Sequence, residues 1–194
     1  MKNEKLSHKT DRNAFVYYVR LENRKDMEPG ELTACGRRLL RQVLHAKYGI
    51  KDEPLRIEKM EHGKPYLADY PKIQYNLSHS GDYLVLGLAA MPIGIDIQEK
   101  RVTDIDKLGK RIFSVDEYRQ FLLSENRQEA FFREWVLKES YVKWTGKGLF
   151  REDIRELPMD GWSQFLYIDN QYFCAIRAEL PLDVHVEEIR LENE

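Results

Sequence analysis

The chain has 194 residues, 42% of them hydrophobic and 11% aromatic, so it is long enough and apolar enough to fold around a core of its own. Its 31 Lys and Arg residues nearly balance 33 Asp and Glu residues, and the net charge of −2 argues against a dedicated nucleic-acid-binding protein. Two cysteines are too few for a disulfide framework. No apolar run approaches the roughly 18–20 residues of a membrane-spanning helix. We therefore expect a soluble, cytoplasmic protein that binds neither nucleic acid nor membrane.

Residue patterns predict the elements in chain order. β-branched and aromatic residues favour a strand at 14–21, and apolar residues spaced three and four apart predict a helix at 31–48. Extended segments follow at 56–60, 73–77, 83–90 and 93–98, then two short helical segments between 104 and 123 and a long helix at 128–144. Further strands are predicted at 154–157, 164–168, 172–178 and 184–189, with a hairpin turn at 169–170.

This order repeats one pattern, a long helix followed by about three strands, first from residue 31 and again from residue 128. The expected fold class is therefore α+β, a pseudo-twofold duplication of a helix-plus-three-strand unit with a cleft between the halves. We place the N-terminal half at residues 1–95 and the C-terminal half at 96–194. Because both halves lie in one chain, we expect a monomer.

A carboxylate interrupts the apolar stripe of the long helix. Glu139 falls among apolar side chains at helical spacing, and Lys143 follows one turn later. A carboxylate on a buried face costs free energy unless it is paired or binds a cation. An ordinary Glu–Lys ion pair at a helix surface has the same spacing. The helix alone leaves both interpretations open.

The strand at 93–98 carries a second carboxylate. Strict alternation places its isoleucines on one face, Asp96 and Gln98 on the other, and Glu99 away from them. Asp96, Gln98 and Glu139 offer only oxygen donors, which suits Mg²⁺ rather than zinc. Mg²⁺ usually binds one or two carboxylates together with substrate phosphates, so a phosphorylated ligand is the implied partner.

Two segments contain side chains that suit phosphate. Lys64 lies in a Gly-Lys-Pro turn, and Ser78 and His79 lie between two predicted strands. Each has an ordinary explanation as well, because a lysine in a turn is normally solvated. Ser and His near turns often bind backbone groups. These segments alone do not decide between the two.

Four segments together match a known family: HGKPYL (62–67), NLSHSGDY (76–83), PIGIDIQ (92–98) and FFREWVLKESYVKWTGKGL (131–149). They resemble the 4′-phosphopantetheinyl transferases of the surfactin-synthetase-activating (Sfp) type. The signatures are a G-I-D strand and, some forty residues later, W-x-x-K-E-x-x-x-K, here Trp135, Lys138, Glu139 and Lys143. The resemblance runs from about residue 31 to residue 178, with the motifs in the order of the family.

The resemblance implies the 4′-phosphopantetheinyl transferase fold and an Mg²⁺-dependent enzyme. Such an enzyme moves the 4′-phosphopantetheine arm of coenzyme A onto a serine of an acyl or peptidyl carrier protein and releases adenosine 3′,5′-bisphosphate. The alternative is a catalytically idle module of the same fold that binds coenzyme A or the carrier. Gln98 keeps this alternative open, because family members often have Glu at its position.

Roles of single residues are carried over by position. Asp96 and Glu139 match the acids that hold Mg²⁺ against the diphosphate, with Gln98 as a third candidate ligand. The residues expected to bind coenzyme A are Thr33, Lys64, Ser78, His79 and Lys143. The catalytic set is Asp96, Glu139 and Lys143, with Glu139, or a metal-bound water beside it, as the base for the carrier serine. Arg24 and Lys25 are rough substitutes for the family's 3′-phosphate contacts. The N-terminal half is thus expected to contact the coenzyme A phosphates, and the C-terminal half to carry the metal site and the carrier-facing helices.

Overall fold

The structure is a computed structural model of the chain and describes residues 11–22, 24–51, 55–148 and 153–192. The first half forms β1 (Asn13–Arg20), η1 (Arg24–Asp26), α1 (Pro29–Tyr48), β2 (Ile57–Lys59), β3 (Pro65–Leu67), β4 (Gln74–Ser80) and β5 (Tyr83–Ala89). The second half forms β6 (Ile93–Glu99), α2 (Ile105–Ile112), α3 (Val115–Leu123), α4 (Arg127–Thr145), η2 (Ile154–Glu156), β7 (Trp162–Leu166), β8 (Tyr172–Ala178) and β9 (Asp183–Glu188). Both η elements are 3₁₀ helices. Among the described helices, none has the length and hydropathy of a membrane span.

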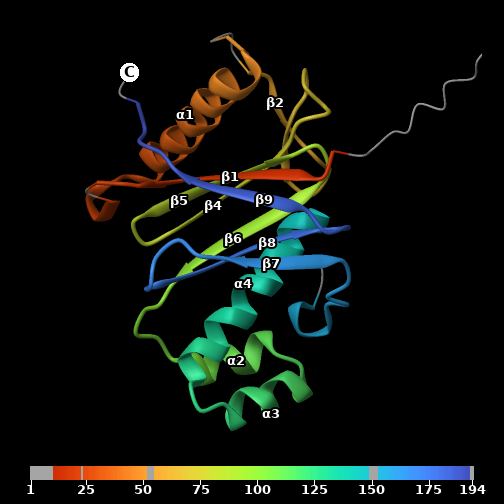
Figure 1. Ribbon diagram of the computed structural model, residues 1–194. Helices are drawn as coiled ribbons and strands as arrows, with labels where there is room; N and C mark the ends of the chain where they lie inside the picture. The colour runs from red at the N-terminus through yellow and green to blue at the C-terminus, as the bar shows by residue number, and fades with distance from the viewer. Residues whose placement is uncertain (1–10, 23, 52–54, 149–152, 193–194) are drawn as a thin grey trace, which may run out of the picture.

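The two halves share one topology, which confirms the expected α+β duplication. The first sheet has the order β4-β5-β1-β9 and the second β6-β8-β7, so β1, β5 and β4 correspond to β6, β8 and β7, antiparallel in both sheets. A long helix lies between the first and second of these strands along each half, α1 in one and α4 in the other. The repeating unit is therefore strand–helix–strand–strand. The last strand, β9, returns to the first sheet and pairs parallel to β1 (Figure 1).

Clusters of buried apolar residues hold these elements together. The isoleucines of β6 are fully buried between the two sheets, against Val16 and Val85 of the first sheet. The other face of the first sheet packs against α1 through leucines of α1 and β5. A third core joins α2 and α3 to α4 through Ile112, Phe113, Phe121, Phe131 and Phe132. In Figure 1, α1 and α4 lie on opposite sides of the pair of sheets.

Side chains of β4 connect the two sheets. The backbone N–H of Ile95 donates to Asn76 Oδ1 at 2.8 Å, and that of Glu99 donates to Ser80 Oγ at 2.9 Å. Between them, the N–H of Ile97 donates to Ser78 Oγ at 3.3 Å. One edge of β6 pairs with β8, and along its other edge these side chains of β4 bind the backbone N–H groups instead of a neighbouring strand. We call this line of contacts the β4–β6 seam.

Gly94 allows α4 to lie directly on β6. A Cβ at this position would overlap the carbonyl oxygen of Ser140 and the backbone nitrogen of Trp144. The helix backbone therefore touches the strand on the face that also carries Asp96. This close approach explains why a glycine precedes the Ile-Asp pair of the signature.

Two predictions of local structure are wrong. Ser78 and His79 were expected between two strands, but both lie within β4, which continues to Ser80 because its side chains bind the backbone of β6. Residues 154–157 were expected as a strand, but residues 154–156 form η2. The carboxylate of Asp153 accepts a hydrogen bond from the backbone N–H of Arg155 at 3.1 Å, which stabilises the start of a helical turn. Ile154 packs against the helical core, so its burial rather than strand pairing accounts for the apolar residue.

Candidate active site

Asp96 is the centre of a polar cluster in which both halves take part. The residue is only 2% exposed. Its Oδ1 accepts hydrogen bonds from Ser78 Oγ at 2.8 Å and from Lys143 Nζ at 2.6 Å, and its Oδ2 accepts from Gln98 Nε2 at 2.9 Å. We call Ser78, Asp96, Gln98 and Lys143 the Asp96 cluster. The sequence-predicted residues of this cluster are thus brought together by β4, β6 and α4.

Ser78 joins these three elements with a single hydroxyl group. The hydroxyl donates to Asp96, and it accepts from Lys143 Nζ at 2.7 Å and from the N–H of Ile97 at 3.3 Å. All three partners of the hydroxyl are buried or partly buried. The hydroxyl therefore holds the ammonium group of Lys143 against the β4–β6 seam. Lys143 is accordingly directed into the site, and its ion pair with Asp96 replaces the surface ion pair that the helix alone left possible.

Glu139 lies one turn before Lys143 on α4 and is partly buried. Burial raises the pKa of its carboxyl group to about 7, and the nearby negative charge of Asp96 acts in the same direction, while Lys143 opposes it. A carboxylate with a pKa near neutrality can accept and release a proton under physiological conditions. This is the property expected of a general base.

The side chains around Asp96 offer the oxygen donors that Mg²⁺ prefers, but in this structure Gln98 turns its Nε2 toward Asp96, and Asp96 Oδ1 accepts from Lys143 and Ser78. Asp96 and Glu139 supply carboxylates, and Gln98 supplies an amide, whose carbonyl oxygen is also a ligand that hard cations accept. Among the described residues, no group of three or more His, Cys, Asp and Glu could hold a metal by itself. A set of this kind suits a cation that also binds substrate phosphates. The strand facing is as predicted: Gln98 lies beside Asp96, while Glu99 Oε1 accepts a hydrogen bond from the Tyr172 hydroxyl at 3.4 Å.

Lys64 holds together the two elements that carry the cluster. Its Nζ donates to the carbonyl oxygens of Ile93 and Trp144, both at 2.9 Å. These are the first residue of β6 and a residue in the last turn of α4, where a positive charge also interacts favourably with the helix dipole. Burial lowers the pKa of Lys64 to about 8. Its contact with coenzyme A stays a prediction.

His79 and Thr33 lie outside the Asp96 cluster. His79 follows Ser78 on β4 and is exposed. Desolvation of the ring by surrounding atoms lowers its pKa, the positive charges of Arg24 and Lys143 lower it further, and Asp96 opposes them. Its pKa therefore lies below that of an ordinary histidine, and the charges of both the Asp96 cluster and Arg24 act on it. Thr33 is exposed in the second turn of α1, on the outer side of the first sheet.

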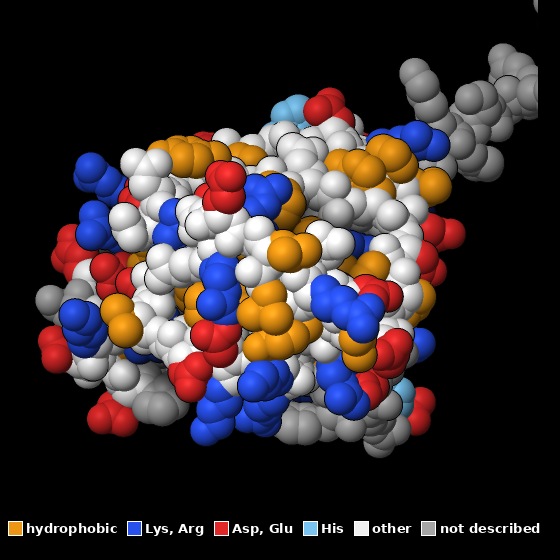
Figure 2. All heavy atoms as spheres, turned by 90° about the horizontal axis from the view of Figure 1, so that it is seen from below, with side chains coloured by type: hydrophobic (Ala, Val, Ile, Leu, Met, Phe, Trp, Pro, Cys, Tyr) orange, Lys and Arg blue, Asp and Glu red, His pale blue; other side chains and the backbone are white. Residues whose placement is uncertain are grey.

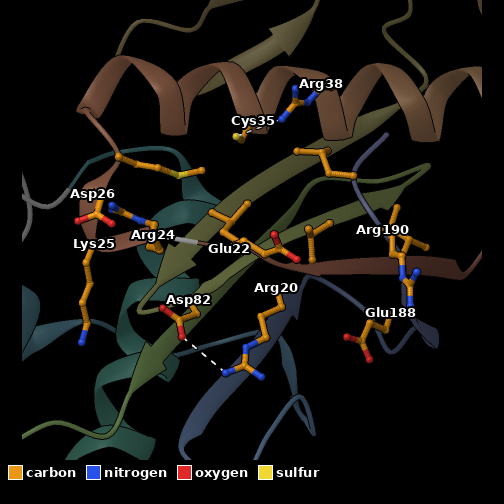
Figure 3. A pocket seen from close by; sticks show the side chains of 15 residues that line it. Arg20, Glu22, Arg24, Lys25, Asp26, Cys35, Arg38, Asp82, Glu188 and Arg190 are labelled. Atoms are coloured by element: carbon orange, nitrogen blue, oxygen red, sulfur yellow. Dashed lines mark hydrogen bonds and ion pairs between the residues drawn. The ribbon is translucent and has the colours of Figure 1, made fainter. Parts of the chain in front are cut away.

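A cavity of about 1160 Å³ lies between η1, α1 and the end of β9 (Figure 3). It is lined by five cations, Arg20, Arg24, Lys25, Arg38 and Arg190, and by four acids, Glu22, Asp26, Asp82 and Glu188. Arg20 pairs with Asp82 at 3.8 Å. The Nε atoms of Arg24 and Arg38 are buried and have no hydrogen-bond partner among the described residues. Buried N–H donors of this kind favour an anionic ligand.

Sequence reasoning missed most of this cavity. Arg24 and Lys25 were expected to contact phosphate, but Arg20, Arg38 and Arg190 were not. Arg190 follows β9, and only the parallel pairing of β9 with β1 brings it near Arg20. No local pattern in the sequence signals that contact. Arg38 is one of several basic residues on α1, and nothing in their spacing distinguishes it.

Comparison with known proteins identifies the family. The profile described as the 4′-phosphopantetheinyl transferase superfamily matches residues 92–184, and the profile described as 4′-phosphopantetheinyl transferase, N-terminal, matches residues 10–92. The two matches meet where β6 begins. The chain belongs to the 4′-phosphopantetheinyl transferase superfamily, as its motifs predicted, and its similarity to Sfp supports the Sfp type.

Several characterised proteins are similar to the chain. The 4′-phosphopantetheinyl transferase psf-1 of Bacillus pumilus is 37% identical over 152 residues, which cover 75% of this chain and 64% of that protein. The Sfp protein of Bacillus subtilis (strain 168) is 33% identical over 156 residues, covering 79% and 65%. The L-aminoadipate-semialdehyde dehydrogenase-phosphopantetheinyl transferase of Rattus norvegicus is 34% identical over 149 residues, covering 65% and 48%. The match thus spans about 64–65% of the length of the bacterial relatives named here.

Among solved structures, holo-[acyl-carrier-protein] synthase of Thermotoga maritima is similar with a TM-score of 0.35 and 24% identity. That similarity covers 44% of this chain and 61% of that chain.

Proposed function

We propose that the protein transfers the 4′-phosphopantetheine group of coenzyme A to a serine of an apo acyl or peptidyl carrier protein and releases adenosine 3′,5′-bisphosphate. The observation that carries the proposal is the Asp96 cluster with Glu139 beside it. A buried carboxylate, a lysine directed into the site and an acid with a pKa near 7 meet where the two halves join. The N-terminal half supplies Ser78, and the C-terminal half supplies Asp96, Glu139 and Lys143.

The reaction needs a proton acceptor. The carrier serine oxygen attacks the phosphorus that bears pantetheine, and the bond from this phosphorus to the bridging oxygen of the diphosphate breaks. The bridging oxygen leaves with its electron pair on the 5′-phosphate of the nucleotide. Glu139 is the proposed acceptor of the proton of the serine hydroxyl.

The reaction also needs positive charge on the diphosphate. Asp96 and Glu139, with Gln98 as a third candidate ligand, would hold Mg²⁺, which would supply positive charge to the diphosphate. Lys143 supplies a second positive charge from α4, and Ser78 orients its ammonium group. Lys64 keeps β6 and α4 together at the end of the site, so it supports the relative position of Asp96 and Lys143.

The arginine-lined cavity is the proposed site of the nucleotide end of coenzyme A. Its buried N–H donors on Arg24 and Arg38 suit the 3′-phosphate, with Lys25 beside them (Figure 3). His79 connects the cavity to the Asp96 cluster, because its ring is near enough to feel the charges of both Arg24 and Lys143. The coenzyme would thus extend from the cavity along β4 to Asp96.

The helices α2 and α3 are the proposed docking surface for the carrier. Lys107, Lys110 and Arg111 are exposed along α2, and Val115 and Leu123 are exposed on α3. Figure 2, the view from below, shows Lys and Arg side chains next to hydrophobic ones on this face of the molecule. Asp106 and Asp116 are exposed on the same two helices, so this surface carries charges of both signs around its apolar side chains. Such a surface suits a partner that offers an apolar contact with a charged rim. We further place the enzyme in the cytoplasm as a monomer without nucleic-acid or membrane partners.

The test is a transfer assay. The protein is incubated with coenzyme A, Mg²⁺ and each of several apo carrier proteins, and the intact mass of each carrier is measured. An added phosphopantetheine is expected with at least one carrier, and Glu139→Gln should reduce the rate by about 10²–10³-fold or more, since it removes a charge and the base. Coenzyme A binding without transfer to any carrier would favour the idle module. A near-normal rate for Glu139→Gln would refute the role of Glu139.

A further inference from the structure

Lys138 is the signature lysine that the Asp96 cluster does not use. It immediately precedes Glu139, so its side chain leaves α4 about 100° away from that residue. The side chain is fully buried. Its Nζ forms an ion pair with Glu117 Oε2 at 2.9 Å and donates a hydrogen bond to the carbonyl oxygen of Ile154, also at 2.9 Å. Lys138 thus joins α4 to α3 on one side and to η2 on the other.

The carboxylate of Glu117 also closes the first turn of α3. Its Oε2 accepts the backbone N–H of Ser114 at 2.7 Å, while Ser114 Oγ accepts the N–H of Glu117, which completes a capping box. The ammonium group of Lys138 therefore binds the oxygen that fixes the N-terminus of α3. A small rotation of α3 about α4 would break the contact of this oxygen with Lys138, while its contact with Ser114 would move with α3.

Other charges around Lys138 do not replace this contact. Glu134 lies one turn earlier on α4, where burial raises the pKa of its carboxyl group and Lys138 partly opposes this rise. Asp153 caps η2, and its hydrogen bonds with Arg155 lower the pKa of its carboxyl group, with a smaller effect of Lys138 in the same direction. The helices are already held by the aromatic core between α2, α3 and α4. A buried ion pair adds little net stability over apolar packing, but it restricts the arrangement of the elements that it joins.

We propose that Lys138 is a positioning residue for the carrier: it fixes α2 and α3 relative to α4, so that a carrier docked on these helices presents its serine to Glu139. The inference rests on the proposed function and concerns only the geometry of the second substrate. It assigns to Lys138 no contact with coenzyme A, with the metal or with the reacting atoms.

The test uses Lys138→Met, which keeps a side chain of similar length without the charge. With carrier concentration varied at saturating coenzyme A, the KM for the carrier should rise about tenfold, a size typical of coupled contacts, while kcat changes less than about threefold. The affinity for coenzyme A, measured by calorimetry, should stay within about twofold. Arg56→Met is the matched control. It removes an exposed ion pair with Asp69 in the N-terminal half and should leave the KM unchanged.

Two further variants separate positioning from folding. Glu117→Gln keeps the whole apolar core and should raise the carrier KM like Lys138→Met, and the double variant should be no worse than Lys138→Met alone. Lys138→Arg, which can donate to the same two oxygens, should restore most of the carrier affinity. If Lys138→Met does not fold, the Glu117→Gln result decides alone.

A fall in kcat with an unchanged carrier KM would overturn the proposal, because Lys138 would then act in the chemical step. Loss of coenzyme A affinity would overturn it as well. Hydrogen exchange of the metal-free protein gives a readout without turnover: the amides of α3 should exchange faster in Lys138→Met, and those of β4 and β6 should not. If wild-type protein modified no carrier, the proposed function would fail, and the exchange data would still show whether Lys138 fixes α3.

Discussion

The raised pKa of Glu139 predicts that Glu139→Gln stabilises the metal-free protein at alkaline pH. The group titrates at about 7 in the folded protein against an ordinary value of 4.5. Between these values the folded protein holds a proton that the unfolded chain has lost. This contribution to stability is complete below the unfolded pKa, and it is lost as the pH rises through the folded pKa. Glutamine has no proton to lose, so the variant avoids this loss.

The size follows from the shift. About 2.5 pKa units correspond to an upper limit of about 3 kcal/mol, and partial solvent contact of the side chain reduces this to about 1–2 kcal/mol. The free energy of unfolding of the wild type, measured relative to the variant, should therefore fall by about 1–2 kcal/mol between about pH 5 and about pH 8.

The measurement is urea unfolding of both proteins in a chelator, followed by circular dichroism at the two pH values. Other titrating groups affect both proteins alike and cancel in the difference. A difference between the two proteins that does not change with pH would show that Glu139 is solvated like a surface carboxylate. Glu139 would then titrate like an ordinary carboxyl group and would not be a base tuned to neutral pH.

Three other predictions test the contacts of the site. Gly94→Ala should lower the free energy of unfolding, measured by urea denaturation, by about 3 kcal/mol or more, because the added Cβ would overlap the backbone of α4. Gly36→Ala is the control: it has room beside Leu77 and should raise the free energy of unfolding by about 0.5–1 kcal/mol. Gln98→Glu should lower the Mg²⁺ concentration for half-maximal transfer, since a carboxylate replaces an amide beside Asp96. Glu99→Gln, on the opposite face of β6, should leave this concentration unchanged. A change with the Glu99 variant and none with the Gln98 variant would assign the third ligand to Glu99. Lys64→Met should lower the free energy of unfolding by about 1–3 kcal/mol, because two backbone carbonyl oxygens lose their donor, and it should weaken coenzyme A binding measured by calorimetry. His79→Ala, at an exposed position, should weaken coenzyme A binding without a change in stability. If neither variant changed the affinity for coenzyme A, Lys64 would have a structural role alone.

The parts of the fold that local patterns determine were predictable. The alternation of residues 93–98 correctly placed Asp96 and Gln98 on one face, because side chains of a strand alternate wherever one face is buried. Helical periodicity correctly identified α1 and α4. The site residues were predicted from the order of four motifs as well as from the chemistry of single side chains. The motifs were needed because Glu139, considered on its helix alone, could equally form an ordinary surface ion pair.

The parts that depend on distant contacts were not predictable. An isolated Ile within 154–157 looks the same whether it packs under a helical turn or in a strand. The bonds of Lys64 go to carbonyl oxygens of Ile93 and Trp144, and backbone acceptors leave no trace in a sequence. Lys138 carries a full charge at a fully buried position, where periodicity predicts an apolar residue. Its contacts with Glu117 and with the carbonyl oxygen of Ile154, both distant in sequence, make this position tolerable.

The return of β9 to β1 has a consequence for how the protein reaches its native state. Residues 13–18 pair with residues 183–188, so the first sheet receives its last strand only after residue 188 has been synthesised. Until then β1 has an open edge, and such edges are sites of aggregation. Pairing across so long a stretch of chain also slows folding. A ribosome-bound or shortened chain that ends before residue 183 should therefore depend on chaperones, even though it already contains Asp96, Glu139 and Lys143.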